Sequence, residues 1–288
     1  MTLASPIIHH PFDFTVFRFS FTGFGIAVLL AFLISQIVCE RELARRGRDV
    51  ESAAVADVLF AALLGTLLGA KLYYVVVVSH NIQDLWSRSG FVFWGGFIGS
   101  VVLCYLTIRY KKLSFVRFAD VAGIAIAAGY AVGRTGCWAV GDDYGKPYSG
   151  PLAVAFPNGS PPSTVAEMQH AFNQKFPAGM DPSTVVSVYP TQILEVLLGF
   201  VMFVILWRMR DHDHAEGWLF GVYCILAGAE RFIVEFFRAK DDRFPWAAGL
   251  SMAQLIALAI VLVGVTIMAA RKRTGPDRPG IRAAAVAV

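Results

Sequence analysis

Long apolar runs dominate the chain and recur seven times along it. They cover residues 16–39, 53–78, 91–108, 119–140, 189–207, 218–237 and 250–270. Each run is close to the roughly twenty residues that an α-helix needs to cross a bilayer. The runs lack the alternation of a membrane β-strand, and backbone groups in hydrocarbon must bond within their own segment. The pattern therefore predicts an all-α polytopic membrane protein with about seven transmembrane helices.

Basic residues between the runs predict how these helices are oriented. Lys and Arg cluster at 41–48, 109–117, 208–210 and 271–273, after the first, third, fifth and seventh runs. Because cytoplasmic loops of membrane proteins carry an excess of Lys and Arg, these four places are expected to share the cytoplasmic side. The N-terminus then lies outside and the C-terminus lies in the cytoplasm.

One long polar segment interrupts the series of runs. Residues 141–188 contain seven prolines and several glycines, which exclude a long helix, and only 165–176 has the pattern of a short amphipathic one. Irregular segments of this length are usually functional. We expect one membrane-embedded domain over residues 1–273, with 141–188 as a long outer segment, and a disordered cytoplasmic tail at 274–288.

Composition narrows the functional classes. Hydrophobic residues make up 56% of the 288 positions and charged residues 16%, which is outside the range of soluble domains. The formal net charge of +4 is explained by the cytoplasmic clusters, so a nucleic-acid partner is not indicated. The four cysteines have no spacing typical of a zinc site or a disulfide framework. No metal or cofactor is expected.

The stretch from 129 to 145 carries the clearest chemical signal. Arg134 lies deep in an apolar run, glycines surround it, and Asp142 and Asp143 follow the run. A guanidinium keeps its proton, so Arg134 must reach water or meet a buried anion. The glycines would let a lipid head group or another helix approach the backbone. The stretch predicts an anion site, and the alternative is a helix-packing seam with one snorkelling arginine.

Further charges fall at the outer ends of later helices. Arg231 and Glu235 are four residues apart and share a helix face, as do Gln192 and Glu195 at three. Lys71 lies toward the outer half of the second helix. Arginines in this setting suit a lipid phosphate, with neighbouring carboxylates to orient them or to act as a base. The alternative is a set of mutually neutralising ion pairs that only allow the helices to insert.

Four segments together resemble prolipoprotein diacylglyceryl transferases. Residues 133–145 are similar to the family signature Gly-Arg-x-Gly-Asn-Phe-x-Asn-Gly-Glu-x-x-Gly, and 91–99 to its Ser-Phe-His-Gly-Gly-x-x-Gly segment. Residues 189–195 resemble His-Pro-Ser-Gln-x-x-Glu, and 231–238 are nearly identical to Arg-x-x-x-Glu-Phe-Phe-Arg. The segments occur in the family's order, from about the second helix to the seventh.

The resemblance implies a specific reaction in the bacterial plasma (inner) membrane. A diacylglyceryl group would pass from phosphatidylglycerol to the lipobox cysteine thiol of a prolipoprotein, with release of glycerol phosphate. The implied partners are phosphatidylglycerol, the signal-peptide region of the prolipoprotein and membrane lipid. The implied catalytic residues are Arg134, Asp142, Arg231 and Glu235. The implied substrate-binding residues are Lys71, Trp94, Gly95, Gly96, Gly133, Gly136, Cys137, Gly145, Gln192 and Glu195.

The chain also departs from the family pattern at polar positions. Trp94 replaces the histidine that is a usual candidate for the base, Cys137 replaces an asparagine, and Asp142 replaces a glutamate. If transfer occurs, the expected base is a carboxylate such as Asp142 or Glu235, or water, since a thiol with a pKa of about 8.5 needs modest help. Two alternatives remain open: a paralogue that lipidates a different acceptor, and a non-catalytic phospholipid-binding membrane protein.

Overall fold

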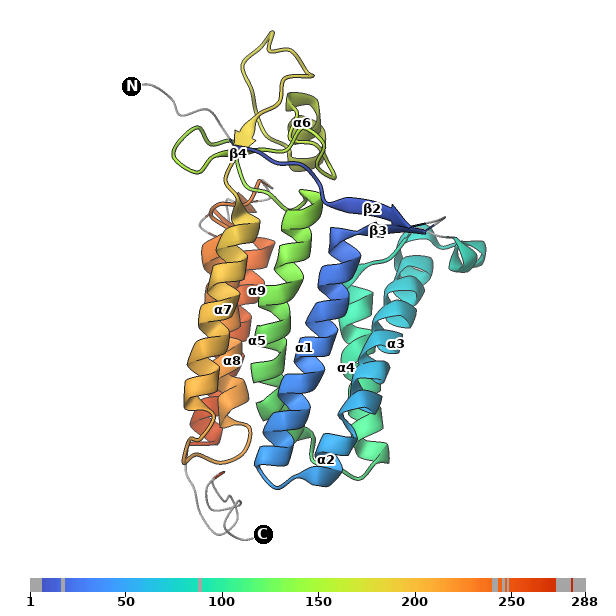
Figure 1. The fold of residues 1–288 in the computed structure, drawn as a ribbon, viewed down its shortest axis with the longest axis vertical. Coiled ribbons are helices and arrows are strands. Elements are labelled where there is room, and N and C mark those ends of the chain that lie inside the picture. Colours follow the sequence, from blue (N-terminus) through green and yellow to red (C-terminus); the bar gives the residue numbers. More distant parts are fainter. Residues whose placement is uncertain are drawn as a thin grey trace.

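The computed structural model describes residues 7–16, 19–87, 90–239, 243–244, 247, 249–272 and 281. Apart from residue 281, the tail predicted at 274–288 lies outside these ranges, so its disorder stays a prediction. The described chain forms an upright bundle of long helices with a smaller folded cap at one end (Figure 1). We call residues 141–190, which make up most of this cap, the head.

The predicted all-α membrane fold is confirmed. Six segments within the described residues are long and apolar enough to cross a membrane. α8 has 17 residues and is not among the six, so the expected count of seven stays a prediction. The long helices are α1 (Gly23–Arg45), α3 (Val55–Tyr73, extended by the π-helix η1, Tyr74–Ser79), α4 (Phe93–Tyr110), α5 (Phe115–Val140), α7 (Thr191–Met209), α8 (Trp218–Val234) and α9 (Met252–Ala270).

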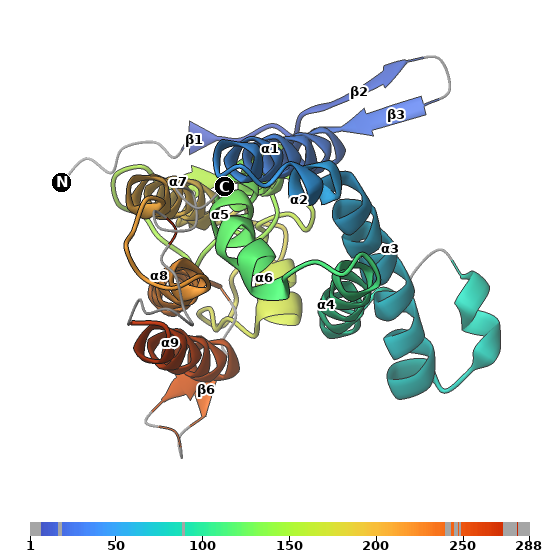
Figure 2. The same ribbon diagram turned by 90° about the horizontal axis from the view of Figure 1, so that it is seen from below.

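α5 is the central helix of the bundle. It packs against α1 on one side and against α7 and α8 on the other, and α9 packs against α8 (Figure 2). In the most apolar 18-residue stretch of α5, 56% of the residues are buried, against 17–28% in the corresponding stretches of the other five candidate spans. This helix is rich in Ala and Gly on its buried faces, which lets its neighbours approach closely. Any group at its end is therefore held by several helices.

α3 and α4 form a separate pair joined by glycines. A Cβ atom on Gly99 would lie 2.3 Å from the carbonyl oxygen of Gly65, and one on Gly95 would lie 2.4 Å from that of Gly69. Real Cβ atoms do not approach a carbonyl oxygen this closely, so these four positions require glycine. Small residues of this kind give membrane helices their closest packing.

The head is a folded unit despite its prolines. A three-stranded sheet joins it to the N-terminal segment: β1 (Ile7–Ile8) pairs in parallel with β4 (Val154–Ala155), which pairs antiparallel with β5 (Ser187–Val188). The predicted amphipathic helix is confirmed as α6 (Val165–Phe172), ending four residues early. Tyr144, Phe156 and Met168 form the buried core of the head. The strands were not predicted, because two-residue strands leave no alternating pattern.

Two further antiparallel pairs lie at the same end of the bundle. The hairpin of β2 (Asp13–Val16) and β3 (Phe19–Thr22) extends sideways from the start of α1 (Figure 1). β6 (Arg243–Phe244) pairs with β7 (Leu250–Ser251) ahead of α9. Two more short helices lie within the described residues: α2 (Asp49–Ala53), and the 3-10 helix η2 (Ile82–Trp86).

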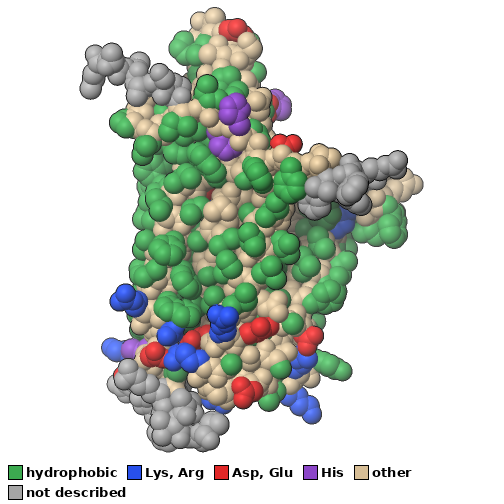
Figure 3. All heavy atoms as spheres, viewed as in Figure 1, with side chains coloured by type: hydrophobic (Ala, Val, Ile, Leu, Met, Phe, Trp, Pro, Cys, Tyr) green, Lys and Arg blue, Asp and Glu red, His purple; other side chains and the backbone are tan. Residues whose placement is uncertain are grey.

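The end of the bundle opposite the head collects the basic residues, and we call it the basic end. Arg45 pairs with Asp211 at 2.7 Å, and Lys111 pairs with Asp57 at 2.6 Å. Arg117 reaches Glu216 at 3.0 Å. Figure 3 shows Lys, Arg, Asp and Glu side chains gathered at this end, below a broad hydrophobic belt over the helices. The belt is the surface expected to face lipid.

The glycine seam predicts a sharp stability difference between two Gly→Ala variants. Gly99→Ala forces a methyl group into the Gly65 backbone, and overpacking of this kind costs about 1–3 kcal/mol. The matched control is Gly25→Ala, whose Cβ would meet only the Thr22 hydroxyl at 3.5 Å. In detergent, we expect Gly99→Ala to lower the thermal midpoint by several degrees and the control to leave it unchanged. Equal midpoints would contradict the proposed packing.

Candidate active site

The end of α5 makes a sharp turn that presents two carboxylates to the bundle. Gly141 ends the helix with φ 71°, in the left-handed region that favours glycine, and the amides of Gly141 and Asp142 donate to the carbonyl of Cys137 at 3.0 and 3.1 Å. Gly145 lets this turn touch the end of α8, because a Cβ there would lie 2.5 Å from the carbonyl oxygen of Phe237. The turn therefore reaches Arg238, which follows α8.

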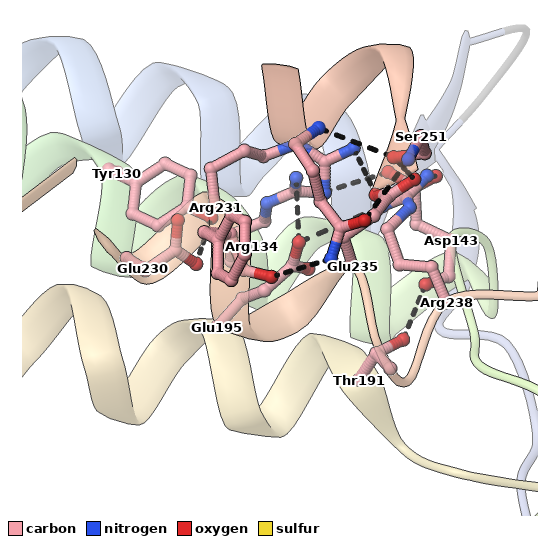
Figure 4. Close-up of polar contacts among 12 residues, drawn as sticks. Tyr130, Arg134, Asp143, Thr191, Glu195, Glu230, Arg231, Glu235, Arg238 and Ser251 are labelled. Carbon is pink, nitrogen blue, oxygen red and sulfur yellow. Dashed lines mark hydrogen bonds and ion pairs between the residues drawn. The ribbon is translucent and has the colours of Figure 1, made fainter. Parts of the chain in front are cut away.

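Two arginines and two carboxylates form a closed ion-pair network at this point (Figure 4). Asp143 lies between Arg134 and Arg238, with one oxygen 2.7 Å from Arg134 Nη1 and the other 2.6 Å from Arg238 Nη2. Glu195, which is fully buried, lies 2.9 Å from Arg134 Nη2 and 3.7 Å from Arg238 Nη1. We call these four residues the arginine network. Its charges balance, which explains how two arginines are accommodated between apolar helices.

A second ion pair lies beside the network. Arg231 Nη2 is 2.6 Å from Glu235 Oε2, on the helix face that the four-residue spacing predicts, and the hydroxyl of Ser251 donates to Glu235 Oε1 at 2.9 Å. Glu235 is buried, while about a third of the Arg231 side chain is exposed. Arg231 Nη1 is buried and has no hydrogen-bond partner within the described residues. A buried donor in this state is ready for an anion.

α7 anchors the turn that carries the carboxylates. The side-chain amide of Gln192 donates to the carbonyl of Asp142 at 2.6 Å, and the hydroxyl of Thr191 donates to that of Asp143 at 2.7 Å. Both side chains are buried at the start of α7. Gln192, predicted to bind substrate, is thus placed where it holds the backbone of the turn, and Glu195 one helical turn later belongs to the arginine network.

Three residues of this constellation have roles that the sequence did not indicate. Asp143 and Arg238 fall within the motifs, but the sequence did not predict that they bridge the elements. Tyr130 was not predicted at all: its hydroxyl donates to Glu230 at 2.8 Å, and its ring lies 5.4 Å from the Arg134 guanidinium. The spacing of four residues between Tyr130 and Arg134, which places both on one face of α5, was the available signal.

Other predicted substrate-binding residues lie on different surfaces. Lys71 Nζ donates to the carbonyl and hydroxyl of Ser87 at 2.7 and 2.8 Å. Trp94 is 44% exposed and packs against Phe93 and Phe97 at ring distances of 5.6 and 6.4 Å. Gly95 and Gly96 face α3 in the glycine seam. Their part in binding substrate stays a prediction.

The glycines of α5 serve the packing role that was the alternative interpretation of this stretch. A Cβ on Gly136 would lie 2.9 Å from that of Ala27 in α1, and one on Gly133 would lie 3.7 Å from that of Ala31. Arg134 reaches partners in the turn and in α7. One segment thus combines a packing seam with a charged site.

The pKa values of the two adjacent carboxyl groups of the turn are shifted in opposite directions. Burial raises the pKa of Asp142, and the charge of Asp143 adds to this effect. Burial would also raise the pKa of Asp143, but the guanidinium groups of Arg238 and Arg134 outweigh it and hold that pKa below its usual range. Asp143 is therefore a fixed anion, while Asp142 is the carboxyl of the two that accepts a proton more readily.

Cys137, Asp142 and Asp143 are the residues here that could ligate a metal. Their potential ligand atoms lie within 4.8 Å of one another. Both oxygens of Asp143 already face guanidinium groups, and a cation at this place would be repelled by them. The geometry therefore does not favour a metal at these three residues.

An apolar cavity opens beside Tyr130. It measures about 570 Å³ and lies between α1, α3, α4 and α5, with α8 contributing at its inner wall. Phe97, Phe118 and Ile126 are typical of its lining, and Tyr130 places one part of it next to Arg134. A cavity of this size and character suits hydrocarbon chains.

Known proteins resemble this chain over most of its length. Residues 11–270 match the family model of prolipoprotein diacylglyceryl transferase. The chain belongs to this family. It is 28% identical to the phosphatidylglycerol–prolipoprotein diacylglyceryl transferase of Geobacter sulfurreducens, over 92% of this chain and 97% of that protein. It is 29% identical to the protein of that name from Clostridium tetani, over 89% of this chain and 96% of that protein. It is also 29% identical to the one from Escherichia coli, over 96% of this chain and 99% of that protein.

The arginine network predicts that a buried and an exposed carboxylate differ greatly in their contribution to stability. Glu195→Gln keeps the packing but leaves two arginines without their shared buried partner, which costs about 3–5 kcal/mol. Asp57→Asn removes the exposed pair with Lys111, worth about 0–1 kcal/mol. Denaturant unfolding in detergent would compare the two variants. Equal losses would contradict the proposed role of Glu195.

Proposed function

We propose that this protein transfers a diacylglyceryl group from phosphatidylglycerol to a cysteine thiol of a prolipoprotein and releases glycerol phosphate. The observation that carries the proposal is the cluster of Arg134, Arg231 and Arg238 (Figure 4), in which Arg134 lies 5.4 Å from the ring of Tyr130, a residue that lines the apolar cavity. The arginines suit a phosphate, and the apolar cavity suits acyl chains. The relatives that span nearly the whole chain are named for this reaction.

The donor's phosphate is held by arginines and its chains by the cavity. Arg231 Nη1, buried without a hydrogen-bond partner within the described part of the chain, gives the phosphate a ready donor. Arg134 lies 5.4 Å from the ring of Tyr130, which lines the cavity, and adds a second guanidinium. Arginine forks bind phosphate oxygens through paired hydrogen bonds, which are strengthened away from water. Glu235 and Glu195 orient the two guanidinium groups.

The chemical step is displacement at the glycerol carbon that carries the phosphate ester. The thiol sulfur forms a bond to this carbon, the carbon–oxygen bond breaks, and its electron pair leaves on the phosphate of glycerol phosphate. The arginines stabilise the charge that develops on the leaving group. Asp142 takes the thiol proton and later releases it to water. Trp94 cannot do so, because an indole nitrogen has no basic lone pair.

The protein works in the bacterial plasma membrane as one membrane-embedded domain over residues 1–273. The basic end faces the cytoplasm and the head faces outward, because Lys and Arg gather at the end opposite the head. The acceptor's signal-peptide region meets the enzyme on the outer side. A nucleic-acid partner is not part of the proposal.

Removing Arg134 tests phosphate-centred catalysis. The assay uses purified protein in detergent with phosphatidylglycerol and a lipobox peptide, and follows both glycerol phosphate release and peptide mass. We expect Arg134→Ala and Arg231→Ala to lower transfer by 10²-fold or more, because charge on the leaving group is no longer stabilised. Lys111→Ala, at the basic end, is the control. Near-normal transfer in both arginine variants would refute the proposal.

Replacing Asp142 tests the identity of the base. Because burial raises its pKa, transfer by the wild-type protein should fall as the pH drops through this raised value, above the usual range near 3.9. Asp142→Asn should lower the turnover rate by about 10²- to 10⁴-fold and abolish this acidic limb of the profile. The profile of turnover against pH in both proteins is the measurement. An acidic limb that persists unchanged in Asp142→Asn would assign the base elsewhere.

A further inference from the structure

A second pocket lies on the outer side of the same turn. It measures about 710 Å³ and is enclosed by the N-terminal segment, the start of α1, the end of α5 and a loop of the head. The residues that line it include His10, Phe12, Asp13, Asp142, Asn158 and Ser160. Phe12, Asn158 and several neighbours are exposed, so the pocket opens to the surface. Its volume is within the range of ligand sites.

The N-terminal segment crosses this pocket as a fixed strap, which we define as residues 7–13. The amides of Ile7 and His9 donate to the carbonyls of Ala153 and Ala155 at 3.0 and 2.9 Å, which ties the strap to the head. The amide of Phe12 donates to the carbonyl of Ala139 at 2.8 Å, which ties it to α5. The wall of the pocket is therefore formed by ordered backbone held at both ends.

The two pockets reach the reacting groups from different directions. The apolar cavity meets Arg134 through Tyr130, and the outer pocket contains Asp142. They share no lining residue among those described. In the arginine network, Arg134 lies beside Tyr130 of the apolar cavity, and Asp143 is the chain neighbour of Asp142 in the outer pocket. A donor and an acceptor could thus occupy separate spaces and meet at the turn.

Charge and polarity decide which substrate each pocket takes. The described lining of the outer pocket includes two carboxylates, Asp13 and Asp142, and no Lys or Arg, so a lipid phosphate would be repelled there. His10, Asn158 and Ser160 offer donors and acceptors that can satisfy a peptide backbone. Phe12 and Phe24 can cover an apolar side chain of such a peptide. This mixture suits a polypeptide.

The hairpin beside the pocket also suits an extended chain. The strap runs directly into β2, which pairs only with β3 among the described strands. A strand with one unpaired edge can accept hydrogen bonds from, and donate them to, an added extended peptide. The acceptor could therefore be recognised through its backbone.

We propose that the outer pocket is the acceptor site, which binds an extended cysteine-containing peptide segment with its thiol at Asp142. This assignment rests on the proposed transfer reaction and adds the location of its second substrate. The thiol approaches the phosphate-bearing carbon from the head side, while the lipid remains in the apolar cavity. The proton passes from sulfur to Asp142, as in the reaction above.

Photocrosslinking locates the peptide without requiring turnover. The full-length protein would carry benzoylphenylalanine at position 158, or at the control position 152, where Leu152 is 75% exposed on the same head but does not line the pocket. The probe is a labelled lipobox peptide with serine in place of its cysteine. We expect at least tenfold more crosslinking at 158 than at 152, suppressed by excess unlabelled peptide. Equal yields at the two positions would overturn the assignment.

Filling the pocket gives an independent kinetic test. Asn158→Trp should raise the KM for the lipobox peptide about tenfold and leave the KM for phosphatidylglycerol within twofold, while Leu152→Trp should change neither. A raised KM for the lipid alone would show that the pocket serves the donor and would refute the assignment. Wild-type protein that crosslinks the peptide at 158 but transfers no lipid would refute the proposed reaction and leave the pocket assigned.

Discussion

The Asp143 carboxylate, shared between Arg134 and Arg238, is the interaction on which the rest of the site depends. An arginine deep in an apolar bundle requires a compensating charge, and removing one partner of a buried pair is strongly destabilising. Here one of the two compensating charges, that of Asp143, comes from outside the helices, on a turn that only glycine at positions 141 and 145 allows. The head is therefore coupled to the membrane bundle through the same contact that balances the site.

This arrangement gives the two adjacent carboxylates different tasks: one is a fixed anion and the other is a proton acceptor. Asp143 is held ionised by two guanidinium groups, and it fixes their positions before any substrate arrives. Asp142 lines the outer pocket, and burial raises its pKa and so favours proton uptake. Preorganised charges of this kind need little rearrangement during reaction, which is a large part of how enzymes stabilise transition states.

The sequence predicted those features that depend on local periodicity. Apolar length identified the spanning segments, and the four-residue spacing of Arg231 and Glu235 predicted their pairing on one face of α8. Contacts across elements were beyond local patterns: the bridge from Asp143 to Arg238 spans 95 residues. Gly95 shows a different limit, since a small residue suits a ligand and a tightly packed helix equally well, and the structure places it in the seam with α3. The head's strands are too short to carry any pattern.

The glycine seam between α3 and α4 has a mechanical consequence. The two backbones are in direct contact at Gly65 with Gly99 and at Gly69 with Gly95, and they cannot slide or separate there without losing that fit, so we expect the pair to move as one body. The apolar cavity lies between this body and α5. A lipid with two chains that enters or leaves sideways therefore meets a wall that can only swing as a whole. We expect the short segments at the ends of the pair to govern the width of such a passage more than rotation of the side chains lining it.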